Sequence, residues 1–360
     1  MRSVIIVHPS FDATWPWTAD HFHTLWKAQG STDFIRLALN ELKTLGELVP
    51  DPGSVTRLIS LNVAVTSDCL RAFNSLKEAV ITTSSYGEPI ADEQMDILKN
   101  AGVAIYTHPS EGYWGQSVSE FGLALTLCGL RRIPQTHHDI ITSLKPWYYE
   151  PENGVGTPKN RGEQFGDDPN FTNGTVEGKR IRIVGAGNIA SRYASFVSML
   201  GADVAAWDPF ATEPSFHRTG ARKEWHLSQL IQDAEIFVPM VPLTEKTTGL
   251  ITAEHIHSLP KGCLVVLVTR AEICDMQAIR ERVLNDEISL AADVFDIEPL
   301  PLNDSLLGRH NVVHTPHNAG RTVQANQRWA EKLVEQFLPI SQYELKSVHQ
   351  KTNNKSAPPV

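Results

Sequence analysis

The chain is poor in several features that mark other classes of protein. It has only 4 cysteines in 360 residues, and no two of them form a Cys-x-x-Cys pair, so we expect reduced core thiols rather than a disulfide framework. No run reaches the roughly 18 to 20 consecutive apolar residues that a membrane-spanning helix needs, so we expect no membrane partner. Basic residues are outnumbered, and the net charge of −9 argues against nucleic acid as a partner.

Two further absences narrow the function. The apolar run at residues 3–7 is too short for a signal peptide and is typical of a first strand, so we expect a cytoplasmic protein. Close histidine pairs occur at residues 137–138 and at 255 and 257, but no third ligand with metal-like spacing accompanies them. We therefore expect no metal site. The length of 360 residues is sufficient for two domains, each with its own core.

Short apolar runs alternate with amphipathic stretches in two series, a pattern typical of α/β domains with parallel sheets. In the first series a helix is expected at residues 91–101, and strands at 3–7, 79–82 and 103–107. In the second series helices are expected at 189–200 and 227–233, and strands at 181–184, 203–207, 236–238, 264–268, 290–293 and 312–315. Both series therefore predict doubly wound sheets.

Three segments lie outside these series. Residues 116–132 are apolar and helix-forming, whereas residues 145–178 are rich in proline, glycine and asparagine and predict a long irregular loop. Three roles stay open for this loop: a lid over the site, an arm that contacts a second subunit, or a solvent-exposed connection without a function of its own. The final amphipathic stretch predicts a single long helix over residues 322–345, followed by a frayed tail at 346–360.

A glycine turn at the start of the second series points to a dinucleotide. An apolar strand runs into Gly185-Ala-Gly187, and a helix follows. The first glycine permits the tight turn, the second lets the backbone approach a pyrophosphate, and the small Ala190 allows close packing of helix on strand. The next strand ends at Asp208, at the spacing where a carboxylate accepts hydrogen bonds from the adenosine ribose. That charge repels a 2′-phosphate, so NAD is favoured over NADP. The alternative is a solvated strand-end carboxylate.

Three side chains downstream supply the chemistry for reducing a 2-keto acid beside a nicotinamide. Arg270 can bind the substrate carboxylate through two parallel N–H groups and polarise the carbonyl. His317 can supply the proton, because imidazole titrates near neutrality. Glu298 can orient His317 and favour its protonated form. Taken one at a time, each residue is equally well explained without a catalytic role: Arg270 as half of a surface ion pair, Glu298 as a turn residue and His317 as a loop histidine. Together they approach strand ends on the side where doubly wound sheets bind ligands, which favours an enzyme.

The same segments resemble the D-isomer-specific 2-hydroxyacid dehydrogenases, the family of phosphoglycerate, D-lactate and glycerate enzymes. The matching motifs are Val-Pro-Leu-Thr-Glu-Lys-Thr-Thr-Gly-Leu-Ile at 241–251, Ala-Asp-Val-Phe-Asp-Ile-Glu-Pro-Leu-Pro at 292–301 and Thr-Pro-His at 315–317. The match is dense over residues 180–320 and thinner before them. The resemblance implies that Arg270 binds substrate, that Glu298 partners the histidine and that His317 is the acid/base.

The resemblance also implies an architecture and a cofactor site. The NAD domain, residues 109–317, is expected as an insertion in a smaller flavodoxin-like substrate domain formed by residues 1–108 and 318–345, and the chains are expected to form homodimers. The residues implied to line the NAD site are Gly185, Gly187, Asn188, Ile189, Asp208, Val268, Thr269, Asp293 and Gly320.

Departures from the family pattern bear on the substrate. The catalytic arginine is followed by Ala271 where the family has glycine, so the backbone there cannot use glycine-only conformations. The loop corresponding to the family's substrate loop reads Ser-Ser-Tyr-Gly-Glu at residues 84–88, and the backbone N–H groups of Ser85, Tyr86 and Gly87 can bind the substrate carboxylate. Trp114 is a candidate pocket wall, although large aromatics are more often core residues. The sequence near this loop has no cluster of Lys and Arg that could bind a phosphate group, so we expect an unphosphorylated acid as substrate.

Two alternatives stay open beside the NAD-dependent dehydrogenase. An NAD-binding scaffold or corepressor on the same fold is one, because function depends on the site and not on the fold. A formate-dehydrogenase-like enzyme, which needs no acid/base proton, is the other. In that group a glutamine usually partners the histidine, so Glu298 argues against it.

Overall fold

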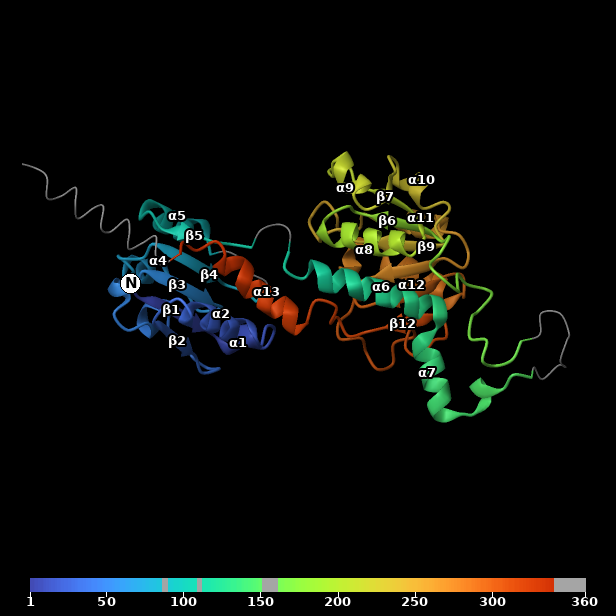
Figure 1. Cartoon of the computed structure of the whole chain (residues 1–360), viewed down its shortest axis with the longest axis horizontal. Helices are drawn as coiled ribbons and strands as arrows, with labels where there is room; N and C mark the ends of the chain where they lie inside the picture. The colour runs from blue at the N-terminus through green and yellow to red at the C-terminus, as the bar shows by residue number, and fades with distance from the viewer. Residues whose placement is uncertain (86–89, 109–111, 151–160, 340–360) are drawn as a thin grey trace, which may run out of the picture. The chain divides into compact units, whose positions relative to one another are not determined.

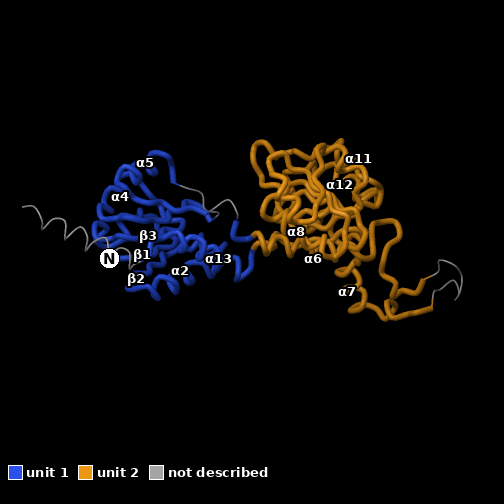
Figure 2. The backbone as a smooth tube through the Cα atoms, turned by 45° about the horizontal axis from the view of Figure 1, so that its top comes forward, with its two compact units in different colours: residues 1–114, 321–360 blue, residues 115–320 orange. Residues whose placement is uncertain are grey.

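The computed structural model describes residues 1–85, 90–108, 112–150 and 161–339 and divides the chain into two compact units. Unit 1 comprises Met1–Trp114 with Arg321–Val360, and unit 2 comprises Gly115–Gly320 (Figure 2). Each unit is built on its own parallel sheet, which confirms the predicted fold class of two α/β domains. Among the described residues, no helix has both the length and the apolar character needed to cross a membrane.

Unit 1 contains a five-stranded parallel sheet (Figure 1). In spatial order its strands are β2 (Thr32–Arg36), β1 (Ser3–Val7), β3 (Arg57–Leu61), β4 (Glu78–Thr82) and β5 (Ala104–Ile105). This order, 2-1-3-4-5, is the flavodoxin-like arrangement. The strands predicted near β1 and β4 are confirmed, and the one predicted at residues 103–107 is shorter than expected. The strands β2 and β3 were not predicted.

Side chains on the two faces of this sheet pack against different helices, because successive residues of a strand point to opposite sides. One face packs on α2 (Thr18–Lys27) and α13 (Val323–Val334), with Trp26 and Trp329 fully buried. The other face packs on α3 (Leu45–Leu48), α4 (Ser67–Arg71) and α5 (Asp92–Asn100). The helix α1 (Pro9–Asp12) and the 3-10 turn η1 (Pro52–Ser54) complete the unit.

The C-terminal helix is shorter than the sequence predicts. α13 ends at Val334 instead of continuing towards residue 345, and the positions after 339 lie outside the described residues. Phe337 leaves the helix to pack on Trp26, with ring centroids 5.1 Å apart, and the backbone N–H of Leu338 donates to the buried carboxylate of Glu78 at 2.8 Å. Pro339 follows and disfavours helix at the preceding residue. These contacts end the helix, although the amphipathic periodicity of the sequence predicts that it continues.

Unit 2 contains a seven-stranded parallel sheet. In spatial order its strands are β12 (Val312–His314), β11 (Ser289–Ala292), β10 (Leu264–Leu267), β9 (Ile236–Pro239), β6 (Arg180–Val184), β7 (Asp203–Trp207) and β8 (Arg222–Lys223). All six strands predicted for this region are present, with ends within one residue of the prediction. Starting from β6, the order is that of a Rossmann sheet with one more strand at the β12 edge.

Helices cover both faces of the unit 2 sheet (Figure 1). On one face α10 (Leu227–Leu230), α11 (Ala253–Ser258) and α12 (Met276–Leu284) enclose a hydrophobic core. On the other lie α6 (Gly115–Arg131) and α8 (Asn188–Met199). A Cβ at Gly129 of α6 would lie 2.8 Å from Leu264, so glycine allows α6 to approach the sheet closely. α6 matches its predicted helix, whereas α10 ends earlier than residue 233.

The predicted irregular loop is largely irregular in the part that the structure describes. Arg132 breaks the helical run with a left-handed backbone (φ 51°), and α7 (Ile133–Thr142) follows. The 3-10 turn η2 (Lys145–Trp147) comes next, and residues 161–179 contain neither helix nor strand. The remaining short elements of unit 2 are α9 (Glu213–His217) and the 3-10 turn η3 (Ala271–Ile273).

Candidate active site

The glycine turn after β6 leaves space for a dinucleotide. Gly185 has a φ of 111°, and a Cβ there would lie 2.8 Å from the backbone oxygen of Met240, so only glycine fits. Gly187 is the N-cap of α8, and an added Cβ would meet nothing within 4 Å. The first turn of α8 directs backbone N–H groups and the positive end of the helix dipole at this open space. The turn therefore fits the pyrophosphate of a dinucleotide.

The structure brings Asp208 to the same turn. Its Oδ2 accepts a hydrogen bond from the backbone N–H of Ala186, between the two glycines, at 2.8 Å. Its Oδ1 accepts from the N–H groups of Phe210 at 2.9 Å and Ala211 at 3.0 Å. The carboxylate is thus fixed beside the turn by three backbone donors. It places a negative charge where the adenosine ribose of a dinucleotide on this turn would lie.

The two residues after the second glycine join α8 to its neighbours. Asn188 accepts a hydrogen bond from Arg192 Nε at 2.9 Å, and Arg192 also donates to Gln116 of α6 at 2.8 Å. A Cβ at Gly115 would overlap the Asn188 side chain, so the start of α6 lies directly against the start of α8. Ile189 is half-buried in the first turn of the helix.

Arg270 follows the carboxyl end of β10. Val268 and Thr269 are buried, and the Arg270 guanidinium donates to the backbone oxygen of Thr269 at 2.7 Å. Ala271 starts η3 with its methyl group in the unit 2 core, and it is not among the residues with positive φ. The alanine at the family's glycine position is therefore accommodated without strain, and it leaves the arginine at the strand end.

Glu298 and His317 form a close pair. Glu298 Oε2 lies 2.7 Å from His317 Nδ1, and Glu298 Oε1 accepts from the backbone N–H of Phe295 at 2.8 Å. Both side chains are 35% exposed. Because the carboxylate takes Nδ1, the other ring nitrogen, Nε2, is left for a substrate. Glu298 follows β11, which pairs with β10, and His317 follows β12, which pairs with β11, so all three side chains follow the carboxyl ends of successive strands.

Asp293, at the end of β11, lies under the loop that carries the histidine. It is fully buried, and its carboxylate accepts from Thr315 Oγ at 2.6 Å and from the backbone N–H groups of Asn318 and Ala319 at 3.1 and 2.8 Å. Gly320 closes this loop, at the last residue of unit 2. The sequence places Asp293 at a strand end, but it does not reveal these partners.

The remaining predicted substrate residues belong to unit 1. Ser85 Oγ accepts from Asn62 Nδ2 at 3.0 Å and donates to the backbone oxygen of Ser10 at 3.2 Å. The Trp15 indole donates to the backbone oxygen of Ser85 and stacks on Trp114, with ring centroids 6.2 Å apart. Trp114 is thus half-buried in an aromatic cluster. Tyr86 and Gly87 lie outside the described residues.

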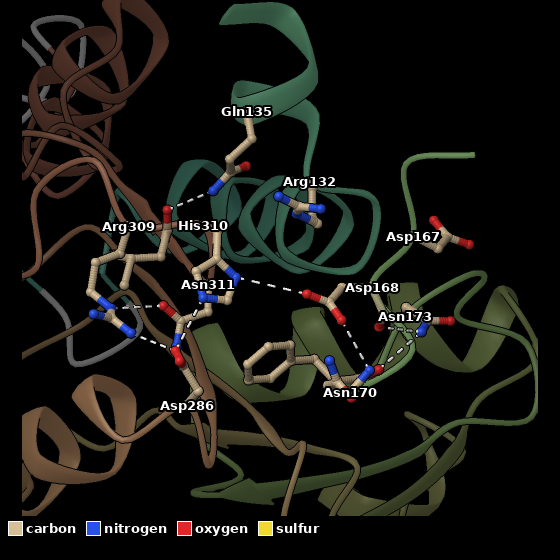
Figure 3. Close-up of polar contacts among 12 residues, drawn as sticks. Arg132, Gln135, Asp167, Asp168, Asn170, Asn173, Asp286, Arg309, His310 and Asn311 are labelled. Carbon is tan, nitrogen blue, oxygen red and sulfur yellow. Dashed lines mark hydrogen bonds and ion pairs between the residues drawn. The ribbon is translucent and has the colours of Figure 1, made fainter. Parts of the chain in front are cut away.

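Sequence reasoning missed a polar cluster at the other end of the unit 2 sheet, where β11 and β12 begin (Figure 3). His310 lies between Asp168, 3.7 Å from Nδ1, and Asp286, 3.1 Å from Nε2. A small cavity beside it is lined by the α6–α7 junction, residues 168–173 and the two strands. These contacts attach residues 168–173 of the irregular loop to the amino ends of the strands, opposite the ends that carry Arg270.

Comparisons with known proteins agree on one family. Residues 156–319 match the family model "D-isomer specific 2-hydroxyacid dehydrogenase, NAD binding domain". The chain is 30% identical over 298 residues to a protein named glyoxylate reductase from Thermofilum pendens, which covers 80% of this chain and 78% of the relative. It is 28% identical to a hydroxypyruvate reductase from Thermotoga maritima, over 76% of this chain and 80% of the relative. Against the D-3-phosphoglycerate dehydrogenase of Bacillus subtilis it is 27% identical but spans only 49% of that relative.

Solved structures share the fold. D-2-hydroxyisocaproate dehydrogenase matches with a TM-score of 0.66 and 18% identity, over 92% of this chain and 94% of the other. A phosphoglycerate oxidoreductase from Rhizobium etli matches with a TM-score of 0.68 and 17% identity, over 93% of each chain. The structural likeness extends over both units, and the sequence likeness extends across most of the glyoxylate reductase. The chain therefore belongs to the D-isomer-specific 2-hydroxyacid dehydrogenases, a family of NAD-dependent oxidoreductases.

Proposed function

We propose that the protein interconverts an unphosphorylated 2-keto acid and a D-2-hydroxy acid with NAD, and that His317 is the acid/base. The observation that carries this proposal is the pair of Glu298 and His317, 2.7 Å apart at the edge of the sheet where Arg270 also lies. Bound NADH supplies the hydride that reduces the keto carbon. The residues of the chain bind and orient the acid and move the proton.

Each of the three side chains has a distinct task. The Arg270 guanidinium binds the substrate carboxylate and draws electron density from the keto oxygen. The Glu298 carboxylate accepts the Nδ1–H of His317, which fixes the ring orientation and stabilises the imidazolium. The protonated Nε2 of His317 gives its proton to the keto oxygen as hydride arrives, and it takes the proton back in the reverse direction.

We propose NAD as the cofactor, on the glycine turn and beside Asp208. The open space over Gly187 suits the pyrophosphate, and the fixed carboxylate of Asp208 accepts hydrogen bonds from ribose hydroxyls and repels a 2′-phosphate. The other residues proposed to line the site follow the ends of β6, β10, β11 and β12: Gly185, Asn188, Ile189, Val268, Thr269, Asp293 and Gly320.

We propose a small acid as substrate, because relatives over most of the chain are named glyoxylate and hydroxypyruvate reductases. Ser85, Tyr86 and Gly87 are the proposed carboxylate-binding loop of unit 1, with Trp114 as an aromatic wall. Trp114 lies in the same aromatic cluster as Trp15, whose indole donates to the Ser85 backbone, so the described end of this loop is attached to a rigid group of rings.

We further propose a cytoplasmic homodimer. Large apolar side chains are exposed on α7 and on the residues after it, a surface that a second copy of the chain can bury. These side chains are Ile133, Ile140, Ile141, Leu144, Trp147, Tyr148 and Tyr149. All four cysteines are free, and three of them are buried, which suits a reducing compartment.

The first experiment follows NADH oxidation by absorbance with glyoxylate, hydroxypyruvate, pyruvate and bulkier 2-keto acids, with NADPH in parallel. The His317→Ala variant should lose at least about a hundredfold in kcat while still binding NADH, the usual size of a general-acid contribution. The matched control is His257→Ala, an exposed histidine of α11, which should leave kcat unchanged. An unchanged rate for His317→Ala would exclude it as the acid/base. If NADH binds but no keto acid of the panel is reduced, the result would favour an NAD-binding scaffold instead of an enzyme.

A further inference from the structure

The loop that carries His317 is held in a conformation that needs support. His317 has a φ of 52°, in the left-handed region that costs a residue with a Cβ about 1 kcal/mol or more. Its backbone N–H donates to the oxygen of Thr315 at 3.1 Å, across the ring of Pro316. Such a conformation persists only when surrounding contacts fix it. The contacts that do so are not on the imidazole.

Asp293 fixes the backbone on both sides of the histidine. Its carboxylate accepts from Thr315, two residues before His317, and from the N–H groups of Asn318 and Ala319, directly after it. Both carboxylate oxygens contact this loop, and the side chain has no exposed surface. An ionised carboxylate is acceptor-only, which suits three donors converging on one side chain.

Ser117 holds the loop from the other side. Its hydroxyl donates to the backbone oxygen of Ala319. Ser117 lies in the first turn of α6, just after the chain enters unit 2 at Gly115, and Ala319 lies just before the chain leaves unit 2 after Gly320. One hydrogen bond therefore joins the entering and leaving segments of unit 2 at the histidine loop.

We propose that Asp293 and Ser117 are positioning residues that fix the His317 loop, so that the imidazole meets Glu298 and presents Nε2 to the substrate. This inference rests on the proposed function. It adds to the place beside NAD proposed above for Asp293, because the carboxylate also holds the proton-transfer loop. Loss of the Thr315 or Ser117 hydroxyl should lower kcat through the histidine and leave the affinity for NADH nearly unchanged.

The test uses isosteric variants of the full chain. Thr315→Val keeps the shape but removes one donor to Asp293, and Thr315→Ser restores the hydroxyl. We expect Thr315→Val to lower kcat about tenfold and Asp293→Asn about a hundredfold, the size of effect that a small misplacement of a reacting group produces. Ser117→Ala should lower kcat by less than either of these two variants. In Thr315→Val and Ser117→Ala the NADH Kd, measured by fluorescence, should stay within about twofold. Thr126→Val, which removes another buried hydroxyl bond in unit 2, is the matched control and should leave kcat unchanged.

Two readouts separate positioning from a general loss of structure. In Thr315→Val kcat should fall while the NADH Kd stays the same, and Thr315→Ser should restore kcat, which a general loss of structure would not do. The NMR resonances of the His317 ring, compared between wild type and variant at one fixed pH, should move as the ring shifts against Glu298, and this measurement needs no activity. An unmoved kcat and unmoved ring resonances in both Thr315→Val and Ser117→Ala would overturn the inference, as would an NADH Kd that weakens by as much as kcat/KM. Absence of activity in wild type across the keto-acid panel would overturn the proposed function, and the ring resonances would then decide the positioning role alone.

Discussion

His108 makes the stability of unit 1 dependent on pH in a way that can be calculated. Its ring packs against Tyr113 and Trp329, with centroids 4.3 and 4.5 Å away, and neither of its buried ring nitrogens has a hydrogen-bond partner among the described residues. Burial lowers the pKa of His108 from the ordinary 6.5 to about 4, because a buried imidazolium loses its hydration. The folded chain therefore binds this proton more weakly than the unfolded chain does.

The sign and size follow from that difference. The stability associated with neutral His108 is fully present above pH 6.5 and is lost as pH falls from 6.5 towards 4, where the folded form also takes up the proton. Between about pH 7 and about pH 4.5, this linkage removes about 2 kcal/mol of unfolding free energy. Replacement by phenylalanine keeps an aromatic ring in the site and removes the titrating group.

The assay is urea unfolding of wild type and His108→Phe at about pH 7 and about pH 4.5, followed by tryptophan fluorescence, to which Trp329 beside the ring contributes. Wild type should lose about 2 kcal/mol more than the variant between the two pH values. His137→Gln, at an exposed histidine of α7, should behave as wild type. Equal losses in wild type and His108→Phe would refute the reasoning.

Three further predictions concern other parts of the chain. Asp208→Ser should raise the KM for NADH about tenfold and bring NADPH closer to it, because a charged acceptor is lost; a wild type that already prefers NADPH would show that Asp208 has been misread. Glu78→Ala should lower the unfolding free energy by about 3 to 5 kcal/mol, since it removes the buried carboxylate that pairs with Arg57 and accepts from the backbone N–H of Leu338; a loss under about 1 kcal/mol in urea titration would contradict this. Ile141→Asp should convert a dimer into a monomer in sedimentation, and a wild-type monomer would exclude the homodimer.

Six of the seven strands in the unit 2 sheet could be predicted, because each is a short apolar run between turn residues, and each of the six was expected within one residue of its observed ends. The polar edge strand β8 (Arg222–Lys223) was not predicted. The strands β2 and β3 of unit 1 were missed for the opposite reason. β2 has a polar edge sequence, and β3 buries Arg57, which a local pattern assigns to the surface. Arg57 is tolerated inside because Glu78 and the ring of Trp26 lie against it, contacts that no local window contains.

In the candidate site, too, the local sequence predicts some features, whereas others depend on contacts between distant parts of the chain. Arg270, Glu298 and His317 could be singled out because chain order alone puts them after apolar strands, and parallel strands bring their carboxyl ends to one edge. The backbone at His317 is left-handed, and the buried carboxylate of Asp293 accepts from the residues on both sides of it. Neither has a signature in the sequence, because a backbone angle and a buried hydrogen-bond set depend on partners 22 or more residues away. Residue types at strand ends can therefore predict a reaction class, whereas the geometry that makes the reaction efficient has to be read from the folded chain.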